Sequence, residues 1–380
     1  KCSADAARLM HRRRNANECF GACNKDDNPW QLSGGDIKWY TDWLAVRGVN
    51  LFIPHAFYYS ICGKRKDERP PDVGPHSIWW AHYEAWSTYW RRLSWLMTDI
   101  DLHAEAAVLC RNRDLCPDTV RPLFERQIGF QYIPESYFPA CTVEDGALWL
   151  HGHRYTAVLG DKALFPDAAH PEVSALEPDC RCDPPQPMLR CASFNKEGRA
   201  CWLLVNEGNT PIKTRLTLPV DAPLCRYDLW NGQPCACPAE RTAKGACLPL
   251  ELPARGSLLL FTCTARESEA LPLPPTYLSL AAPDFALADE DAAHLTKTYR
   301  ATLQITATEL QTATPLLTLP GQEMAELTVN GQPAGVSFWP PHKFPLAGLL
   351  TPGENTLTLT LTGSPANRYG KYPVPYGLER

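Results

Sequence analysis

The sequence predicts a multidomain protein whose first 165 residues combine helices with strands and whose later residues form β-sheets. Three observations lead to this prediction. The chain has 380 residues, enough for two to four domains. Eight of its 12 tryptophans fall between Trp30 and Trp95, where strand-like and helix-like patterns take turns. From residue 186 onward, short strand patterns are separated by turn signals, as in β-sandwiches.

Residues 1–100 predict a repeated strand–helix unit. The segment 36–46 carries apolar side chains at helical spacing, and Asp36 is a suitable residue to cap its start. Residues 51–53 form a short apolar run of the kind found in buried parallel strands. Residues 79–97 predict a second long helix, in which five tryptophans recur at helical spacing and are expected to pack rather than to bind. These are Trp79, Trp80, Trp86, Trp90 and Trp95.

Residues 101–165 predict a small α/β module. A strand is expected over 106–109, a helix over 117–128 with Pro117 in its first turn, and a strand over 130–133. The segment has no glycine-rich phosphate loop, so we expect it to bind no nucleotide.

The remaining residues predict β-structure interrupted by one linker. Residues 186–264 carry strand patterns typical of a sandwich, and residues 265–296 are rich in Pro and Ala and predict a linker. A further β-domain is expected over 297–380. Within it, Asn330-Gly331 is the strongest hairpin signal in the chain, because this dipeptide accepts the positive φ angles of a tight turn. Residues 356–362 alternate Thr and Leu, which predicts a strand with one buried face.

Composition and charge exclude several classes of protein. The formal net charge is −5, and no long basic run marks a nucleic-acid surface. The chain has no run of about 18 apolar residues, so we expect no transmembrane helix and no membrane partner. Its 16 cysteines are scattered, which favours free thiols in a reducing, cytoplasmic compartment over a disulfide framework. The pairs Cys180-x-Cys182 and Cys235-x-Cys237 lack the spacing of zinc sites, so no metal is expected.

Three short motifs near the C-terminus resemble a known sugar-binding module. They are Val329-Asn330-Gly331, Trp339-Pro340-Pro341 and Gly353-Glu354-Asn355-Thr356-Leu357. Together they look like the jelly roll of family 2 and related glycoside hydrolases, over residues 297–368. The resemblance implies a galactose-binding-like jelly roll. It leaves open whether this module binds sugar or only supports a catalytic domain.

The N-terminal region resembles the last quarter of a glycosidase (β/α)8 barrel. The resemblance is carried by Asn17-Glu18-Cys19-Phe20-Gly21, Asp36-Ile37-Lys38, Asp42-Trp43 and Arg47-Gly48-Val49-Asn50. The domain order is similar to that of the α-L-rhamnosidase-like family 106, and the match is weakest between residues 160 and 190. It implies an incomplete barrel over 1–100, followed by the α/β module, the sandwich and the jelly roll.

Glu18 is the candidate catalytic residue. In (β/α)8 enzymes the reactive groups stand at the C-terminal ends of strands, and the resemblance places Glu18 where the seventh strand ends. Glycoside hydrolysis needs one carboxyl group to protonate the leaving oxygen and another to attack or to activate water. We expect the general acid to come from a strand that these residues do not contain. The alternative is a surface glutamate in a loop.

His55, Tyr58 and Tyr59 are candidate substrate-binding residues. His55 follows the expected strand, so its imidazole should reach the barrel rim and contact a sugar hydroxyl. The alternative is a histidine that bonds a neighbouring backbone carbonyl. The rings of Tyr58 and Tyr59 suit the C–H surface of a pyranose, and packing explains them equally well.

Arg69 and Asp72 are further substrate-binding candidates, in a charged loop after the expected eighth strand. This loop either lines a subsite or is simply solvated.

The leading hypothesis is a partial glycoside hydrolase with a carbohydrate partner and no cofactor. These residues supply at most two strand–helix units of a barrel, so the chain alone is expected to be inactive. One alternative is a non-catalytic carbohydrate-binding or scaffold protein. Another is a subunit that works as a homo-oligomer or with a missing N-terminal polypeptide.

Overall fold

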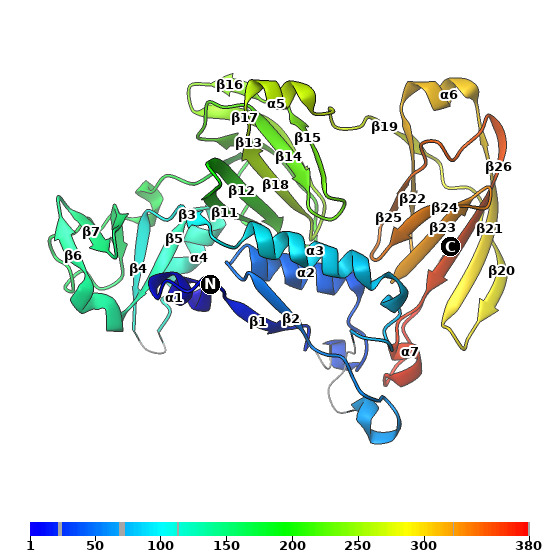
Figure 1. The fold of residues 1–380 in the computed structure, drawn as a ribbon, viewed down its shortest axis with the longest axis horizontal. Helices are drawn as coiled ribbons and strands as arrows, with labels where there is room; N and C mark the ends of the chain where they lie inside the picture. The colour runs from blue at the N-terminus through cyan, green and yellow to red at the C-terminus, as the bar shows by residue number, and fades with distance from the viewer. Residues whose placement is uncertain (22–24, 68–72, 112–113, 322, 379–380) are drawn as a thin grey trace. The chain divides into compact units, whose positions relative to one another are not determined.

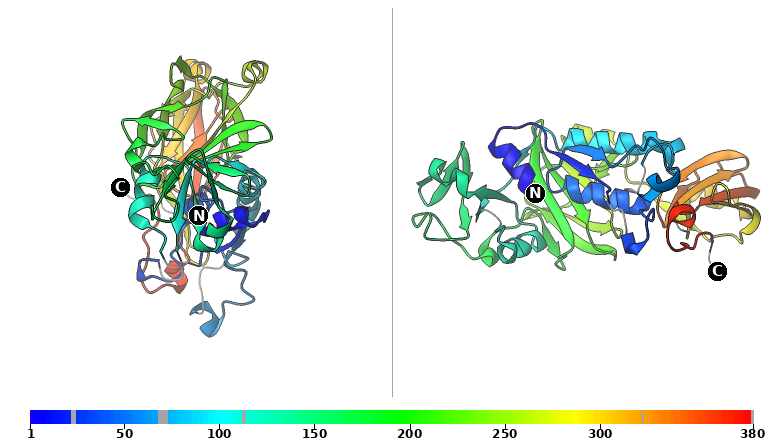
Figure 2. Two further views of the ribbon diagram at one scale, coloured as in Figure 1. Left: turned by 90° about the vertical axis from the view of Figure 1, so that its left-hand side faces the viewer. Right: turned by 90° about the horizontal axis from the view of Figure 1, so that it is seen from below.

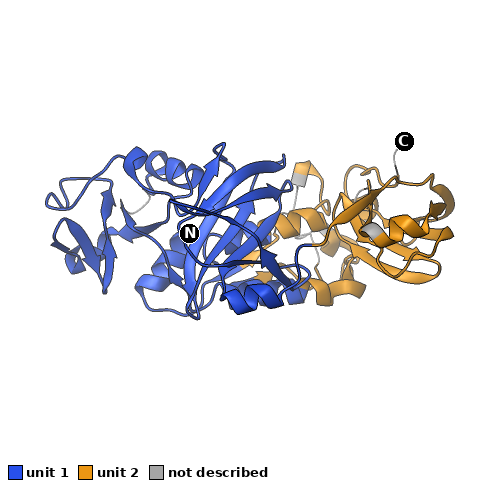
Figure 3. Cartoon of the chain, turned by 90° about the horizontal axis from the view of Figure 1, so that it is seen from above, with its two compact units in different colours: residues 1–17, 41–52, 87–274 blue, residues 18–40, 53–86, 275–380 orange. Residues whose placement is uncertain are grey.

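The computed structural model describes residues 1–21, 25–67, 73–111, 114–321 and 323–378 (Figure 1). The chain divides into two compact units (Figure 3). Unit 1 contains residues 1–17, 41–52 and 87–274, and unit 2 contains residues 18–40, 53–86 and 275–380. None of the described helices is both long enough and apolar enough to cross a membrane.

The first two strands, β1 (Ala16–Cys19) and β2 (Leu51–Pro54), form a two-stranded sheet. The Asn50 N–H donates to the Asn15 carbonyl at 3.2 Å, and the His55 N–H donates to the Cys19 carbonyl at 2.8 Å. The residue numbers of both partners increase together from the first bond to the second, so the two strands run parallel. No barrel closes around this pair within the described residues. The barrel fragment therefore stays a prediction.

Helices α2 (Gly34–Ala45) and α3 (Tyr83–Leu96) lie side by side (Figure 1 and the right view of Figure 2). Trp90 Nε1 in α3 donates to Thr41 Oγ1 in α2 at 3.1 Å. Both helices were expected from their periodicity, but α3 begins later than residue 79 because a 3₁₀ turn covers residues 80–82.

The start of α2 differs from the expected cap at Asp36. Ser33 Oγ accepts the Asp36 N–H at 3.1 Å, and the Asp36 carboxylate accepts the Ser33 N–H at 3.0 Å. This reciprocal pair is a capping box. The cap is therefore Ser33, and Asp36 is its partner inside the first turn.

The α/β module of unit 1 contains a parallel sheet with the order β5-β4-β9. Its strands are β4 (Ala106–Cys110), β5 (Phe130–Pro134) and β9 (Ala157–Leu159), and its helices are α1 (Cys2–Leu9) and α4 (Pro117–Glu125). Helix α4 ends before the expected residue 128, because Gln127 has a φ of 54° and leaves the helix. A three-stranded antiparallel sheet follows, with β6 (Thr142–Glu144), β7 (Ala147–Leu150) and β8 (His153–Tyr155).

Two antiparallel sheets of unit 1 enclose a second core. The six-stranded sheet has the order β15 (Gln233–Cys237), β14 (Leu224–Asp228), β18 (Ser257–Thr262), β12 (Arg199–Asn206), β11 (Leu189–Lys196) and β3 (Asp101–Leu102). The four-stranded sheet has the order β10 (Arg181–Asp183), β13 (Ile212–Leu218), β17 (Gly245–Leu252) and β16 (Glu240–Thr242). Trp202 and Leu260 from the first sheet and Leu216 and Leu250 from the second belong to one buried cluster, as in a β-sandwich.

The segment 265–296, expected to be a linker, contains regular structure. It holds α5 (Ala265–Ala270), β19 (Tyr277–Leu280) and β20 (Ala286–Asp291). Strand β20 pairs with β21 at the edge of a sheet, and five of its six residues are exposed. An exposed edge strand has no buried face, so its sequence lacks the apolar alternation that marks a strand.

Unit 2 builds its β-core from a five-stranded and a three-stranded sheet. The first has the order β20, β21 (Thr296–Ile305), β26 (Gly353–Thr362), β23 (Met324–Val329) and β24 (Gln332–Ser337). The second has the order β19, β22 (Thr314–Leu319) and β25 (His342–Pro345), with β19 and β22 parallel. Two short helices, α6 (Ala307–Thr312) and α7 (Ala366–Tyr369), complete the chain. Leu357, Leu359 and Leu361 of β26 are buried in the shared core, as their alternation predicts.

The predicted Asn330-Gly331 hairpin is present between β23 and β24. Asn330 has a φ of 52° and Gly331 a φ of 79°. Gly331→Val should destabilise unit 2 by about 2 kcal/mol, because a β-branched residue resists positive φ. A Cβ at this position would meet no atom within 4 Å, so the effect isolates backbone strain. Thermal unfolding monitors the change, and Gly331→Asn, whose side chain tolerates this conformation, is the control. A valine variant that melts at the wild-type temperature would contradict the turn.

His342 makes the stability of unit 2 depend on pH. Burial lowers the pKa of His342 from its ordinary value of 6.5 to about 4. The unfolded chain therefore binds this proton first as the pH falls, and the fold loses stability between about pH 6.5 and 4. The expected loss is about 3 kcal/mol. Urea unfolding at several pH values should show a smaller loss in His342→Gln. An identical pH dependence in the two proteins would refute this role.

Candidate active site

Glu18 and His55 lie together at the carboxyl ends of the two parallel strands. Glu18 is the third residue of β1, and His55 directly follows β2. His55 Nδ1 lies 3.1 Å from Glu18 Oε1, at hydrogen-bonding distance. The side chain of Glu18 is 72% exposed whereas that of His55 is 12% exposed. The carboxylate is thus accessible to a ligand, and the imidazole beneath it is held by the fold.

Tyr58 supports the other side of the imidazole. Its hydroxyl lies 3.5 Å from His55 Nε2, and the two rings meet edge to face with centroids 6.1 Å apart. A carboxylate only accepts hydrogen bonds, so His55 carries a proton on Nδ1 when it donates to Glu18. In the neutral ring Nε2 is then the acceptor, which the Tyr58 hydroxyl can satisfy. The three side chains form one chain of donors and acceptors.

Trp30 packs against Tyr58, and no sequence pattern indicated that it belongs to this group. It is buried and contacts Tyr58 edge to face, with ring centroids 6.3 Å apart. Its indole Nε1 donates to the Lys66 carbonyl at 2.8 Å, and its ring also packs on Tyr369 at 5.1 Å. Trp30 lies outside any helix or strand, and Tyr369 is 339 positions further along the chain, so no local periodicity connects them.

Cys19, the neighbour of Glu18, is not a competing nucleophile. Its side chain is buried, and burial raises the pKa of the Cys19 thiol to about 12. Thiol chemistry requires the thiolate, which is scarce at neutral pH when the pKa is this high. Of these two neighbours at the end of β1, only Glu18 presents an accessible side chain.

The other predicted substrate-binding residues have different outcomes. Tyr59 is 95% exposed, so its ring is accessible rather than packed. Arg69 and Asp72 lie outside the described residues, and their predicted roles stay predictions.

The packing role expected for five tryptophans is only partly correct. Trp79, Trp86 and Trp90 are buried, but Trp80 and Trp95 are exposed. Trp80 belongs to an aromatic cluster with Phe57 and Tyr83, whose ring centroids lie 5.3 to 6.0 Å apart. The packing prediction from helical spacing is wrong for Trp80, because this residue lies in the 3₁₀ turn before α3 and not in the helix.

Potential metal ligands and cysteines were located in the described part of the chain. No group of three or more His, Cys, Asp or Glu side chains there is arranged to hold a metal ion. The 15 cysteines that the structure describes are free thiols. The Sγ atoms of Cys225 and Cys263 lie 2.7 Å apart.

Comparison with solved structures relates this fold to glycosidases. A rhamnosidase from Novosphingobium sp. PP1Y matches 96% of this chain and 45% of its own length, with a TM-score of 0.70 and 14% identity. A β-galactosidase from G. stearothermophilus matches 68% of this chain and 60% of its own, with a TM-score of 0.36 and 10% identity. A β-galactosidase from Bacillus circulans sp. alkalophilus matches 60% of this chain and 52% of its own length, also with a TM-score of 0.36 and 10% identity.

No protein-family model and no curated protein matches the sequence. At 14% identity, the match to the rhamnosidase concerns the fold alone, and this chain spans less than half of that protein's length. The chain therefore has a glycosidase-like fold over nearly all of its described residues.

Proposed function

We propose that this chain is part of a glycoside hydrolase and that Glu18 is one of its two catalytic carboxyl groups. The observation that carries the proposal is the Glu18–His55 pair at the shared ends of two parallel strands, 3.1 Å apart. Its support from comparison is the fold shared with a rhamnosidase. We extend the proposal to the family 106 type, with the β-domain of unit 2 as a jelly roll that supports the catalytic domain.

In this mechanism Glu18 acts as the nucleophile or as the base that activates water. Both roles need an accessible carboxylate, and the Glu18 side chain is largely exposed. His55 is a positioning residue, because its N–H holds one carboxylate oxygen and leaves the other available. Tyr58 keeps the imidazole in the tautomer that donates to Glu18.

Substrate contacts come from the exposed aromatic side chains that follow His55. Tyr59 is almost fully exposed, and Phe57 and Trp80 are 53% and 41% exposed within one cluster. Aromatic faces bind the apolar C–H surface of a sugar ring. Arg69 and Asp72 are proposed to contact hydroxyl groups of the same substrate.

The general acid is proposed to come from polypeptide that joins the chain in the complete enzyme. The described hydrogen bonds around His55 bring in one carboxyl group, that of Glu18, whereas hydrolysis requires two. The rhamnosidase of similar fold is more than twice as long as the part matched here. The chain by itself should therefore be inactive.

A panel of nitrophenyl glycosides tests the proposal on two proteins. One is the chain alone, and the other is the longest polypeptide that its gene encodes. Turnover is expected only for the longer protein. Turnover by the chain alone would show that both carboxyl groups are already present. A longer protein that binds glycosides without cleaving any of them would favour the non-catalytic alternative.

A further inference from the structure

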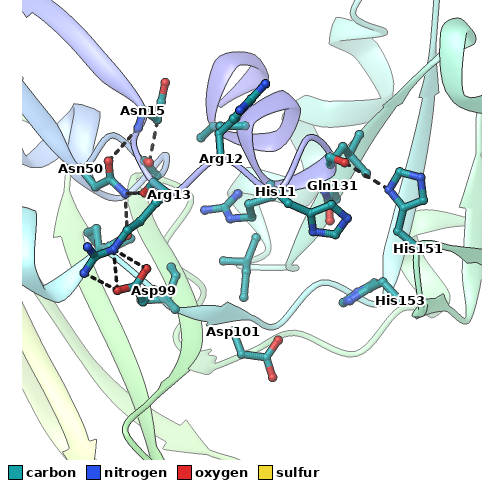
Figure 4. Close-up of a pocket in the computed structure, with 18 of the residues that line it drawn as sticks. His11, Arg12, Arg13, Asn15, Asn50, Asp99, Asp101, Gln131, His151 and His153 are labelled. Carbon is teal, nitrogen blue, oxygen red and sulfur yellow. Dashed lines mark hydrogen bonds and ion pairs between the residues drawn. The ribbon is translucent and has the colours of Figure 1, made fainter.

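Unit 1 contains a cavity of about 550 Å³ that the proposed active site does not use. It lies between the end of α1 with the turn that follows it, the segment before β3, and the β7–β8 hairpin (Figure 4). Every lining residue belongs to unit 1, whereas Glu18 and His55 belong to unit 2. Pockets of 300 to 1,000 Å³ are of the size that binds small molecules.

Two histidines give this cavity hydrogen-bond acceptors. His151 Nδ1 lies 3.1 Å from the Leu9 carbonyl, and His153 Nε2 lies 3.1 Å from the Ala104 carbonyl. A carbonyl oxygen only accepts, so these two nitrogens carry the protons. The remaining nitrogen of each neutral ring is then an acceptor, and both side chains line the cavity.

Asp101 adds a carboxylate to the acceptors. Figure 4 shows it across the cavity from His11, whose ring stacks on that of His151 with centroids 5.4 Å apart. Asp101 is exposed, and its carboxylate forms no hydrogen bond or ion pair within the described part of the chain.

Three arginines from one short segment supply the donors. Arg8 donates to Asp5 at 2.8 Å, and Arg13 donates to Asp99 at 2.9 Å. A guanidinium has five N–H groups, so each of these arginines keeps further donors. Arg12 is exposed and has no side-chain partner among the residues that the structure describes.

We propose that this cavity binds a neutral mono- or disaccharide, separately from the proposed active site. A sugar hydroxyl both donates and accepts, so it is satisfied by donors and acceptors that line the same space. Leu102, which is partly exposed, provides an apolar contact for the C–H surface of the sugar. An oxyanion is disfavoured, because Arg8 and Arg13 are already paired with Asp5 and Asp99 and the unpaired Asp101 carboxylate would repel it.

Buried hydrogen bonds and an unusual backbone conformation define the shape of this site. Tyr155 is buried and donates its hydroxyl proton to Gln131 Oε1 at 2.9 Å, and both residues line the cavity. His11 and His151 have φ angles of 53° and 51°, in the left-handed region that ordinary residues seldom adopt. Residues held in such conformations concentrate at functional sites.

Isothermal titration calorimetry on the 380-residue chain tests the proposal. The probes are D-galactose, L-rhamnose and lactose, with D-galacturonate and inorganic phosphate as anionic counterparts. At least one neutral sugar should bind with a Kd on the order of 1 mM, more tightly than either anion. Asp101→Asn and His153→Ala should each weaken binding about tenfold, as expected for the loss of one strong hydrogen bond.

Two controls separate this site from the rest of the molecule. Asp167→Asn changes an exposed aspartate of unit 1 that does not line the cavity, and it should bind as the wild type does. Glu18→Gln should also bind normally, so the result does not depend on the proposed active site. No sugar binding, tighter binding of an anion, or equal weakening in Asp167→Asn would each overturn the proposal. If sugar binding were weakened only in Glu18→Gln, the sugar would bind in unit 2 rather than in this cavity, and the proposal would be overturned as well.

Discussion

In the complete enzyme, Glu18→Gln should lower kcat/KM for an aryl glycoside by about a thousandfold. This corresponds to about 4 kcal/mol of transition-state stabilisation. Glutamine keeps the size of the side chain and can still contact His55, but a neutral amide neither attacks the anomeric carbon nor accepts a proton from water. Steady-state kinetics should show the loss mainly in kcat, because ground-state binding does not depend on this charge.

Two further variants sharpen this test. Glu290→Gln changes an exposed carboxylate of unit 2 in the edge strand β20 and should leave the kinetics unchanged. His55→Ala should cost about tenfold and alter the pH profile of kcat, because in the proposed mechanism His55 positions Glu18. Normal turnover by Glu18→Gln would remove Glu18 from the mechanism.

Trp86→Ala should destabilise unit 2 by about 3 to 5 kcal/mol. Its indole is fully buried and packs on Phe338, Trp339 and Trp79, with ring centroids 5.4, 5.9 and 6.3 Å away. Truncation to alanine removes this apolar contact and leaves a cavity that the surrounding rings cannot fill. Urea unfolding followed by tryptophan fluorescence measures the change in the free energy of unfolding.

Trp95→Ala is the matched control from the same helix. Its ring is 57% exposed and contacts the ammonium group of Lys196, whose Nζ lies 4.4 Å from the ring centroid. The expected cost is at most about 1 kcal/mol. Trp95 belongs to unit 1, so the comparison concerns burial within one helix. Equal destabilisation of the chain by the two substitutions would mean that burial does not decide the cost of removing a tryptophan from α3.

Local signals predicted those parts of the fold that local physics controls. The Asn330-Gly331 hairpin follows from two residues that accept positive φ, and β26 follows from the alternation of Thr and Leu. Helix α2 follows from apolar spacing, although its cap is Ser33 rather than Asp36. Strand β20 was missed because its exposed residues carry no periodic signal, and β19 was missed because its alternation covers only four residues.

At the candidate site, the sequence predicted the residues but not their contacts. The sequence alone determined which residue types stand at the ends of β1 and β2, and so identified Glu18 and His55 as candidates. Only the tertiary structure decided that they meet, because parallel pairing of β1 with β2 joins groups 37 residues apart. The cavity of unit 1 likewise joins Arg12, Asp101 and His153 from segments with no common periodicity. Periodicity reports which face of an element is buried, whereas the meeting of distant polar groups depends on how the chain packs.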